Sequence, residues 1–135
     1  MAAKTLYLDN ALLNAVLTHT SFTSPTTVYT ALFTTAPTTA YTSGSPTGVE
    51  VTDVNYARQA STFSSASGGS TANTGTLAFF GAGAASSVGS VVAVGVFDAL
   101  TSGNLLYFGN LTTAKTIGVG DTLSFASSAL NIAES

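Results

Sequence analysis

The sequence contains no cysteine and no tryptophan, and it carries very little charge. Without cysteine the chain can form neither a disulfide nor a thiolate metal site, so neither device supports its fold. Only 7% of the 135 residues are charged, whereas an ordinary globular domain has about a quarter. The solubility of the chain must therefore depend on serine, threonine, asparagine and glycine, a composition that suits contact with other proteins.

Positive charge is especially scarce. The cationic side chains are Lys4, Arg58 and Lys115, and six acidic residues outweigh them to give a net charge of −3. Affinity for nucleic acid comes mainly from clustered lysine and arginine side chains that neutralise phosphates. The sequence has no such cluster, so we expect the chain to bind neither DNA nor RNA.

Long apolar runs are missing as well. No segment approaches the roughly 20 apolar residues that a membrane-spanning helix requires. The N-terminal segment has one lysine followed by an apolar stretch, as in a signal peptide, but Asp9, Asn10 and Asn14 interrupt that stretch. We therefore expect no signal peptide and no membrane partner.

The apolar content is nevertheless sufficient for one core. Hydrophobic residues make up 45% of the chain and its mean hydropathy is +0.41, which excludes disorder over most of its length. A chain of this length is typical of one domain and too short for two well-filled cores. We expect a single domain over residues 1–135.

Residue periodicity predicts where the first elements lie. Apolar residues at helical spacing predict an amphipathic helix over residues 8–18, with Asp9 close to its N-terminal cap. Residues 26–35, TTVYTALFTT, alternate in a way that predicts a strand buried on both faces. Residues 36–49 are rich in proline, glycine, serine and threonine, which predicts a long exposed loop.

The rest of the sequence predicts short antiparallel strands. We expect a flexible turn over residues 64–73, and a hairpin closed by the turn residues DALTSGN. The last two strands are expected to pair with each other. With about seven strands and no helix between them, the predicted fold is an all-β antiparallel β-sandwich or open barrel with one N-terminal α-helix. The predicted segments are 56–63, 74–82, 90–97, 105–111, 116–126 and 129–133.

The single histidine, His19, lies at the predicted end of the helix. An imidazole there can bond the terminal carbonyls, so we favour helix capping over catalysis. Serines are abundant enough for a Ser-His-Asp set, but the G-x-S-x-G signature that positions such a serine is missing. We expect no catalytic residue and no enzymatic activity.

The carboxylates are dispersed along the chain. Glu50 and Asp53 form the one close pair, at the end of the long loop, where a calcium ion could be held. Calcium loops supply more oxygen ligands at shorter intervals, so two solvated loop charges are the favoured interpretation. Asp98 and Asp121 are predicted turn residues. We expect no bound metal.

Two further features could carry chemistry. In AFFGAGAAS, Gly81, Gly83 and Ser86 resemble a dinucleotide-binding turn, but that motif requires a following helix and a strand pattern follows instead. We therefore expect a small-residue turn and no cofactor. Arg58 is the one charge inside a predicted strand; we favour a structural role, with its head group paired to Asp53, Asp98 or a neighbouring subunit, over contact with a ligand.

Sequence blocks from Leu8 to Ile132 carry a resemblance: LDNALLNAVL, TTVYTALFTTAPT, YARQASTF, STANTGTLAF and VGVFDALTSGNLLYFGNLTTAKTIGVGDTLSFASSALNI. In this order they resemble a family of small tailed-bacteriophage proteins that are commonly catalogued as phage tail fibre proteins. The resemblance implies a structural protein of the virion, assembled in the host cytoplasm. It transfers no binding residues.

Two positions on the virion are then considered. The main interpretation is a capsid decoration, or cement, protein that binds the outer shell through the helix or the 36–49 loop, because the chain has no fibre-like repeat or heptad. The alternative is a tail fibre or tail-tip component that could bind a receptor or carbohydrate. A free carbohydrate-binding module is a third hypothesis, for which Tyr41 is the candidate stacking residue, although the chain has no tryptophan. Low charge and two-sided apolar strands predict homo-oligomers, with the major capsid protein or tail proteins as further partners.

Overall fold

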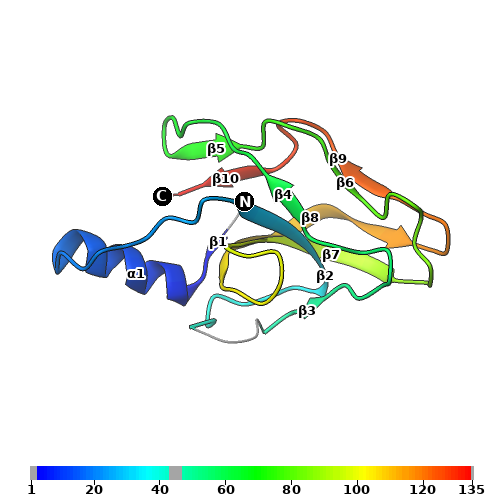
Figure 1. Cartoon of the computed structure of the whole chain (residues 1–135), viewed down its shortest axis with the longest axis horizontal. Coiled ribbons are helices and arrows are strands. Elements are labelled where there is room, and N and C mark those ends of the chain that lie inside the picture. The colour runs from blue at the N-terminus through cyan, green and yellow to red at the C-terminus, as the bar shows by residue number, and fades with distance from the viewer. Residues whose placement is uncertain (1–2, 43–46, 135) are drawn as a thin grey trace.

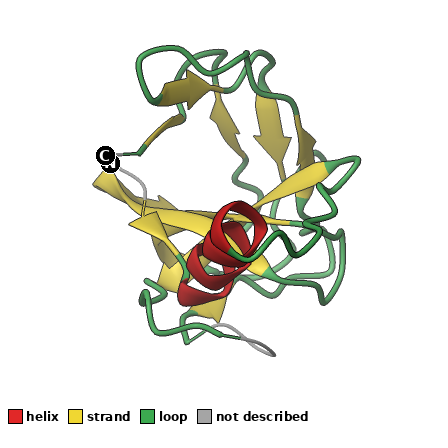
Figure 2. Ribbon diagram, turned by 90° about the vertical axis from the view of Figure 1, so that its left-hand side faces the viewer, coloured by secondary structure: helices red, strands yellow, loops and turns green. Residues whose placement is uncertain are grey.

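The computed structural model of the chain describes residues 3–42 and 47–134 (Figure 1). The described part consists mainly of antiparallel strands, with one helix near the N-terminus. Figure 2 shows strands in two facing layers, a sandwich-like arrangement. The structure therefore confirms the predicted all-β class with one N-terminal helix.

One helix and ten strands lie in the described residues, and several of the strands have only two or three residues. In chain order the elements are β1 (Ala3–Lys4), α1 (Leu6–Leu17), β2 (Val28–Thr35), β3 (Val49–Glu50), β4 (Gln59–Ser61), β5 (Ser70–Ala72), β6 (Leu77–Phe79), β7 (Gly89–Phe97), β8 (Leu105–Ile117), β9 (Leu123–Phe125) and β10 (Asn131–Ala133).

The larger layer is a six-stranded sheet built around the longest strands. Its order is β1-β8-β7-β2-β3, and β4 also pairs with β2. The predicted hairpin is confirmed as β7 and β8, whose register runs from Gly89↔Ile117 to Phe97↔Leu105. Strand β2 lies antiparallel to β7 on its other side. The runs of β-branched and aromatic residues in these three strands favour extended backbone, and together they form the centre of the fold.

The second layer consists of two short antiparallel pairs, β6 with β9 and β5 with β10. The prediction that the last two strands pair with each other is therefore wrong. The turn predicted over residues 64–73 is present at Gly68 and Gly69, between Ser67 and Ser70, but it is shorter than predicted because the same segment contains β5. Buried Asn73 explains the arrangement: its side chain donates to Ala126 O at 3.0 Å and accepts from Leu130 N at 2.9 Å. These bonds turn the chain between β9 and β10 and direct each strand to an earlier partner.

Two cores lie on opposite faces of the main sheet. Strand β2 contributes to both, because Leu32 faces the core between the layers while Ala31 and Phe33 face the core beside α1. The prediction that this strand is buried on both faces is confirmed. The buried residues between the layers are Leu32, Val51, Leu77, Phe79, Phe80, Ala84, Val91, Ile117 and Leu123; those on the other face are Ala31, Phe33, Tyr41, Ala93, Phe97 and Leu105.

Helix α1 begins two residues earlier than predicted. Thr5, not Asp9, is the N-cap: its hydroxyl accepts from Leu8 N at 3.4 Å and donates to Leu105 O at 2.7 Å. Asp9 instead lies in the first turn, where a negative charge complements the helix dipole. The start of the helix is thus set by a contact with β8, 100 residues away in the sequence.

The C-terminal end of the helix differs from the predicted imidazole cap. Thr18 N and Thr20 N both donate to Asn14 O at 3.1 Å, and the Thr18 hydroxyl donates to the same carbonyl at 2.8 Å. His19 adopts a left-handed backbone with a φ of 58°, the conformation that commonly ends a helix. Its contribution is therefore the backbone turn rather than the side chain.

The segment predicted as a long exposed loop over residues 36–49 is only partly described, because residues 43–46 lie outside the described residues. Within it, Pro37 and Tyr41 are buried against the body, while residues 38–40 are exposed. No helix in the described part of the chain is long and apolar enough to span a membrane.

Candidate functional site

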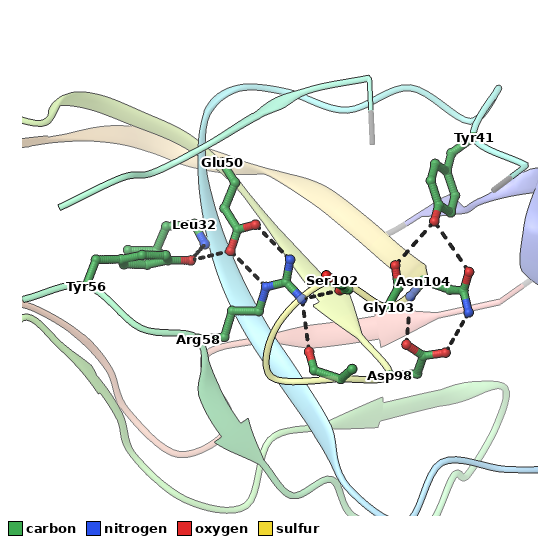
Figure 3. Close-up of polar contacts among 10 residues, drawn as sticks. Leu32, Tyr41, Glu50, Tyr56, Arg58, Asp98, Ser102, Gly103 and Asn104 are labelled. Carbon is green, nitrogen blue, oxygen red and sulfur yellow. Dashed lines mark hydrogen bonds and ion pairs between the residues drawn. The ribbon is translucent and has the colours of Figure 1, made fainter. Parts of the chain in front are cut away.

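The most extensive polar cluster surrounds Arg58, whose side chain is 8% exposed (Figure 3). Its Nε and Nη2 atoms donate to the two carboxylate oxygens of Glu50, each at 2.8 Å. The remaining nitrogen, Nη1, donates to the carbonyls of Ala99 at 2.9 Å and Ser102 at 2.7 Å. A single guanidinium therefore joins β3 to the turn between β7 and β8.

Aromatic rings complete the Arg58 cluster. The guanidinium carbon lies 3.5 Å from the centre of the Phe97 ring, a cation–π contact. The Tyr56 hydroxyl donates to Glu50 at 3.0 Å and accepts from Leu32 N at 3.0 Å. Burial, followed by the Glu50 carboxylate, raises the pKa of Tyr56, which keeps this hydroxyl protonated as a donor.

These contacts give Arg58 a structural role, as predicted, but with a different partner. The sequence predicts a pairing with Asp53, Asp98 or a neighbouring subunit, whereas the structure pairs Arg58 with Glu50. Glu50 is therefore not the solvated loop charge that the sequence predicts, because its carboxylate is paired with Arg58. Because four of the five guanidinium N–H donors already bond groups within the chain, the cluster acts as a clamp between segments.

Asp98 organises the turn on which the clamp rests. Its carboxylate accepts from Asn104 N at 2.7 Å and from Asn104 Nδ2 at 2.9 Å, which confirms the predicted turn role. The Tyr41 hydroxyl reaches the same turn, 3.5 Å from Gly103 O (Figure 3). Tyr41 is only 2% exposed, so it cannot be the open stacking surface that a sugar ring requires.

The glycine-rich turn that resembled a nucleotide loop binds an anion from within the chain. Asp53 accepts from Ala85 N at 3.1 Å and from Ser86 N at 2.9 Å, and also from the Ser86 hydroxyl at 2.8 Å. Strand β7 follows the turn, as predicted, instead of a helix. The amides that might have met a phosphate are thus occupied by a carboxylate. Asp53 remains partly exposed to solvent, as predicted, but it also bonds the backbone of the 85–86 turn.

We predict that Asp53 makes stability depend on pH in the acid range. The Asn55 amide, then the Ala85 amide and Ser86, lower the pKa of Asp53 from 3.8 to about 2. Because the pKa is lowered on folding, the contribution is present above 3.8 and is lost as the pH falls towards 2. Urea unfolding between pH 2 and 6 should show this loss in the native chain but not in Asp53→Asn. If the native chain and Asp53→Asn lost stability equally as the pH falls, Asp53 would not be the group responsible.

Two adjoining hollows lie between the layers. One, of about 290 Å³, lies beside β7, β8 and β10, and the other, of about 420 Å³, extends beneath β5. They share the lining residues Phe63, Val96, Tyr107 and Ile132, which are mainly apolar. Glu134 also lines the second hollow, but it already accepts a hydrogen bond from Tyr107. The hollows thus lack the convergent reactive groups of an active site.

The remaining candidate groups stay apart in the described part of the chain. No set of three or more histidine, aspartate or glutamate side chains there could hold a metal ion. Asp121 accepts from Gly118 N at 2.7 Å, which confirms its predicted turn role. All five tyrosines and eight phenylalanines are buried or half-buried, so the described residues form no open aromatic surface for sugars.

A surface feature that the sequence analysis did not identify is the outer side of α1. Leu13, Val16 and Leu17 expose 56%, 71% and 69% of their side chains. An amphipathic helix has a single apolar side, but apolar residues surround this helix, which buries Leu8 and leaves these three in solvent. Apolar residues on more than one side of the predicted helix are the signal that could have revealed it.

Comparison with protein families gives one match that covers nearly the whole chain. The family model described as podophage GP4 fiber I protein gp80 matches residues 3–133. No curated protein sequence matches the chain. The match includes α1, both layers and the Arg58 clamp, and it confirms the resemblance to phage tail fibre proteins.

Proposed function

We infer that this chain, which belongs to the family of the podophage GP4 fiber I protein gp80 and is therefore a structural protein of the bacteriophage virion, is a component of a tail fibre. The observation that carries the proposal is the family match from residue 3 to residue 133. Because it covers both layers and the helix, it concerns the whole described fold rather than one shared motif.

The nature of the polar clusters supports a structural role without catalysis. Arg58 and Asp53 are the most extensively bonded charged groups, and the hydrogen bonds of both join segments of the chain. Catalysis requires a nucleophile, a base and a stabilising group around one reacting atom. The function of this chain is therefore assembly, with copies of itself and other virion proteins as partners.

A tail fibre is preferred to capsid decoration, the main interpretation of the sequence. That interpretation depended on the absence of a repeat, a heptad pattern and a second domain. The family match favours the fibre instead, since a small domain can be one unit of a fibre that is built from several chains.

The number of copies per virion tests this proposal. Quantitative mass spectrometry of purified particles should find far fewer copies of this chain than of the major capsid protein, because fibres are attached at few positions. The major tail proteins provide an internal reference for complete particles. A copy number comparable to that of the major capsid protein would support decoration of the shell and would overturn the proposal.

A further inference from the structure

The outward side of α1 carries several exposed apolar residues, with the exposed Asn10 between the first of them and the others. Leu6, Leu13 and Leu17 are spaced at i, i+7 and i+11, which places them on one side of a helix, and they expose 41%, 56% and 69% of their side chains. Val16, 71% exposed, lies beside them, whereas Leu8 on the opposite side is only 3% exposed. We call Leu6, Leu13, Val16 and Leu17 the outer face of α1.

The hydrogen bonds that attach α1 to the 39–41 segment lie at its beginning. Leu6 N donates to Thr39 O at 2.9 Å and Tyr7 N donates to Tyr41 O at 2.8 Å. Beyond this turn the helix projects from one end of the molecule (Figure 1). A surface helix that is apolar on its inner and outer sides leaves a hydrophobic surface in water, and such a surface marks an interaction site.

The charge distribution indicates what covers this face. No lysine, arginine, aspartate or glutamate lies between Asp9 and Glu50, so the distal part of α1 offers no countercharge to a charged partner. A charged surface docked here would lose water without gaining an ion pair. The outer face of a second copy is apolar and uncharged in the same way, so the two faces complement each other.

We propose that the outer face of α1 packs against the same face of a second copy of this chain. The proposal rests on the fibre role, because the fibre is where copies of the chain would lie side by side. The contact between the two helices can nevertheless be measured with the isolated protein. A 12-residue helix is about 18 Å long and cannot by itself bury the roughly 1,200 Å² of a standard interface. The pair is therefore weak in solution and becomes effective where an assembly holds neighbours together.

Analytical ultracentrifugation of the full chain over micromolar to millimolar concentrations tests the pairing. The native chain should form a concentration-dependent dimer, and Val16→Glu should raise its dissociation constant at least about tenfold because two carboxylates would meet an apolar face. Val119→Glu is the matched control: Val119 is 70% exposed, against 71% for Val16, and belongs to the turn between β8 and β9. This turn lies at the end of the molecule opposite α1 (Figure 1). Circular dichroism checks that both variants fold.

Cysteine cross-linking gives a second measurement on the same contact. Because the chain has no cysteine, Leu17→Cys can form a disulfide only between copies, and it should yield a covalent dimer on oxidation. Val119→Cys should remain mostly monomeric. A native chain that stays monomeric at all concentrations, or a dimer that Val119→Glu weakens and Val16→Glu does not, would overturn the proposal. If α1 pairing is observed but the virion copy number equals that of the capsid protein, the fibre role falls and the pairing stands.

Discussion

Replacing Arg58 with alanine is expected to lower the free energy of unfolding by about 3 kcal/mol, because it leaves the carboxylate of Glu50 without its partner in a largely buried position. The variant also loses two bonds to the β7–β8 turn and the contact with the Phe97 ring. Urea denaturation followed by circular dichroism measures the change. Arg58→Lys should lie between the native chain and Arg58→Ala, since lysine keeps the charge but cannot form the bidentate pair.

A matched control separates the clamp from charge in general. Lys115 is an exposed cation, and Lys115→Ala should change the free energy of unfolding by no more than about 0.5 kcal/mol. Glu50→Gln should be destabilising, because Arg58 then keeps its charge without a countercharge. If Arg58→Ala were as stable as Lys115→Ala, the cluster would not be a clamp.

Replacing Phe79 with alanine is expected to have an effect of similar size, about 4 kcal/mol, through a different cause. Phe79 is fully buried in β6, stacks on Tyr56 with ring centres 6.2 Å apart, and meets Phe125 of β9 edge to face at 6.2 Å. Its ring thus joins the second layer to the segment that carries the clamp. Removing it would open a cavity that the short strands β6 and β9 cannot close by shifting.

Chemical denaturation measures this loss, with Phe22→Ala as the control. Phe22 is half-buried in the segment between α1 and β2, so its replacement should cost clearly less. Equal losses for the two variants would show that Phe79 does not hold the layers together. A full loss of folding in Phe79→Ala would agree with the account, and Phe79→Leu, which keeps most of the volume, should then recover a folded protein.

The long strands could be predicted from the sequence because their information is local. In β2 and β7, β-branched and aromatic residues predominate over eight or nine positions, and that length is enough to identify a strand. The turn roles of Asp98 and Asp121 were predictable for the same reason, since each bonds a residue within six positions.

The features that were mispredicted depend on contacts between distant segments. The start of α1 is set by Thr5 bonding to Leu105 O, and the turn that sends β9 to β6 and β10 to β5 is set by Asn73 across more than 50 positions. None of these bonds leaves a periodic pattern in the sequence. Short strands of three residues carry too little pattern to specify a partner, so the buried side chain decides.

In the candidate site, too, local features could be predicted from the sequence and contacts between distant segments could not. That Arg58 has a structural role could be predicted from its place among apolar residues, but its partner could not, because Asp53, Asp98 and Glu50 are all near enough in sequence or fold to compete. The structure assigns Asp53 to the 84–86 turn and leaves Glu50 for Arg58. Similarly, the apolar residues of α1 predict a helix. They do not predict which side of the helix is exposed to water, because that depends on the bonds by which Thr5 and Tyr7 attach the helix to the body.

The most direct test of the central claim, that this chain is a tail fibre component, is its location on the particle. Purified phage can be labelled with gold-conjugated antibodies raised against the folded protein and imaged by negative-stain electron microscopy. The account predicts gold particles along the tail fibres and a bare capsid surface, with antibodies to the major capsid protein as the positive control for the shell. Gold distributed over the capsid, with unlabelled fibres, would contradict it.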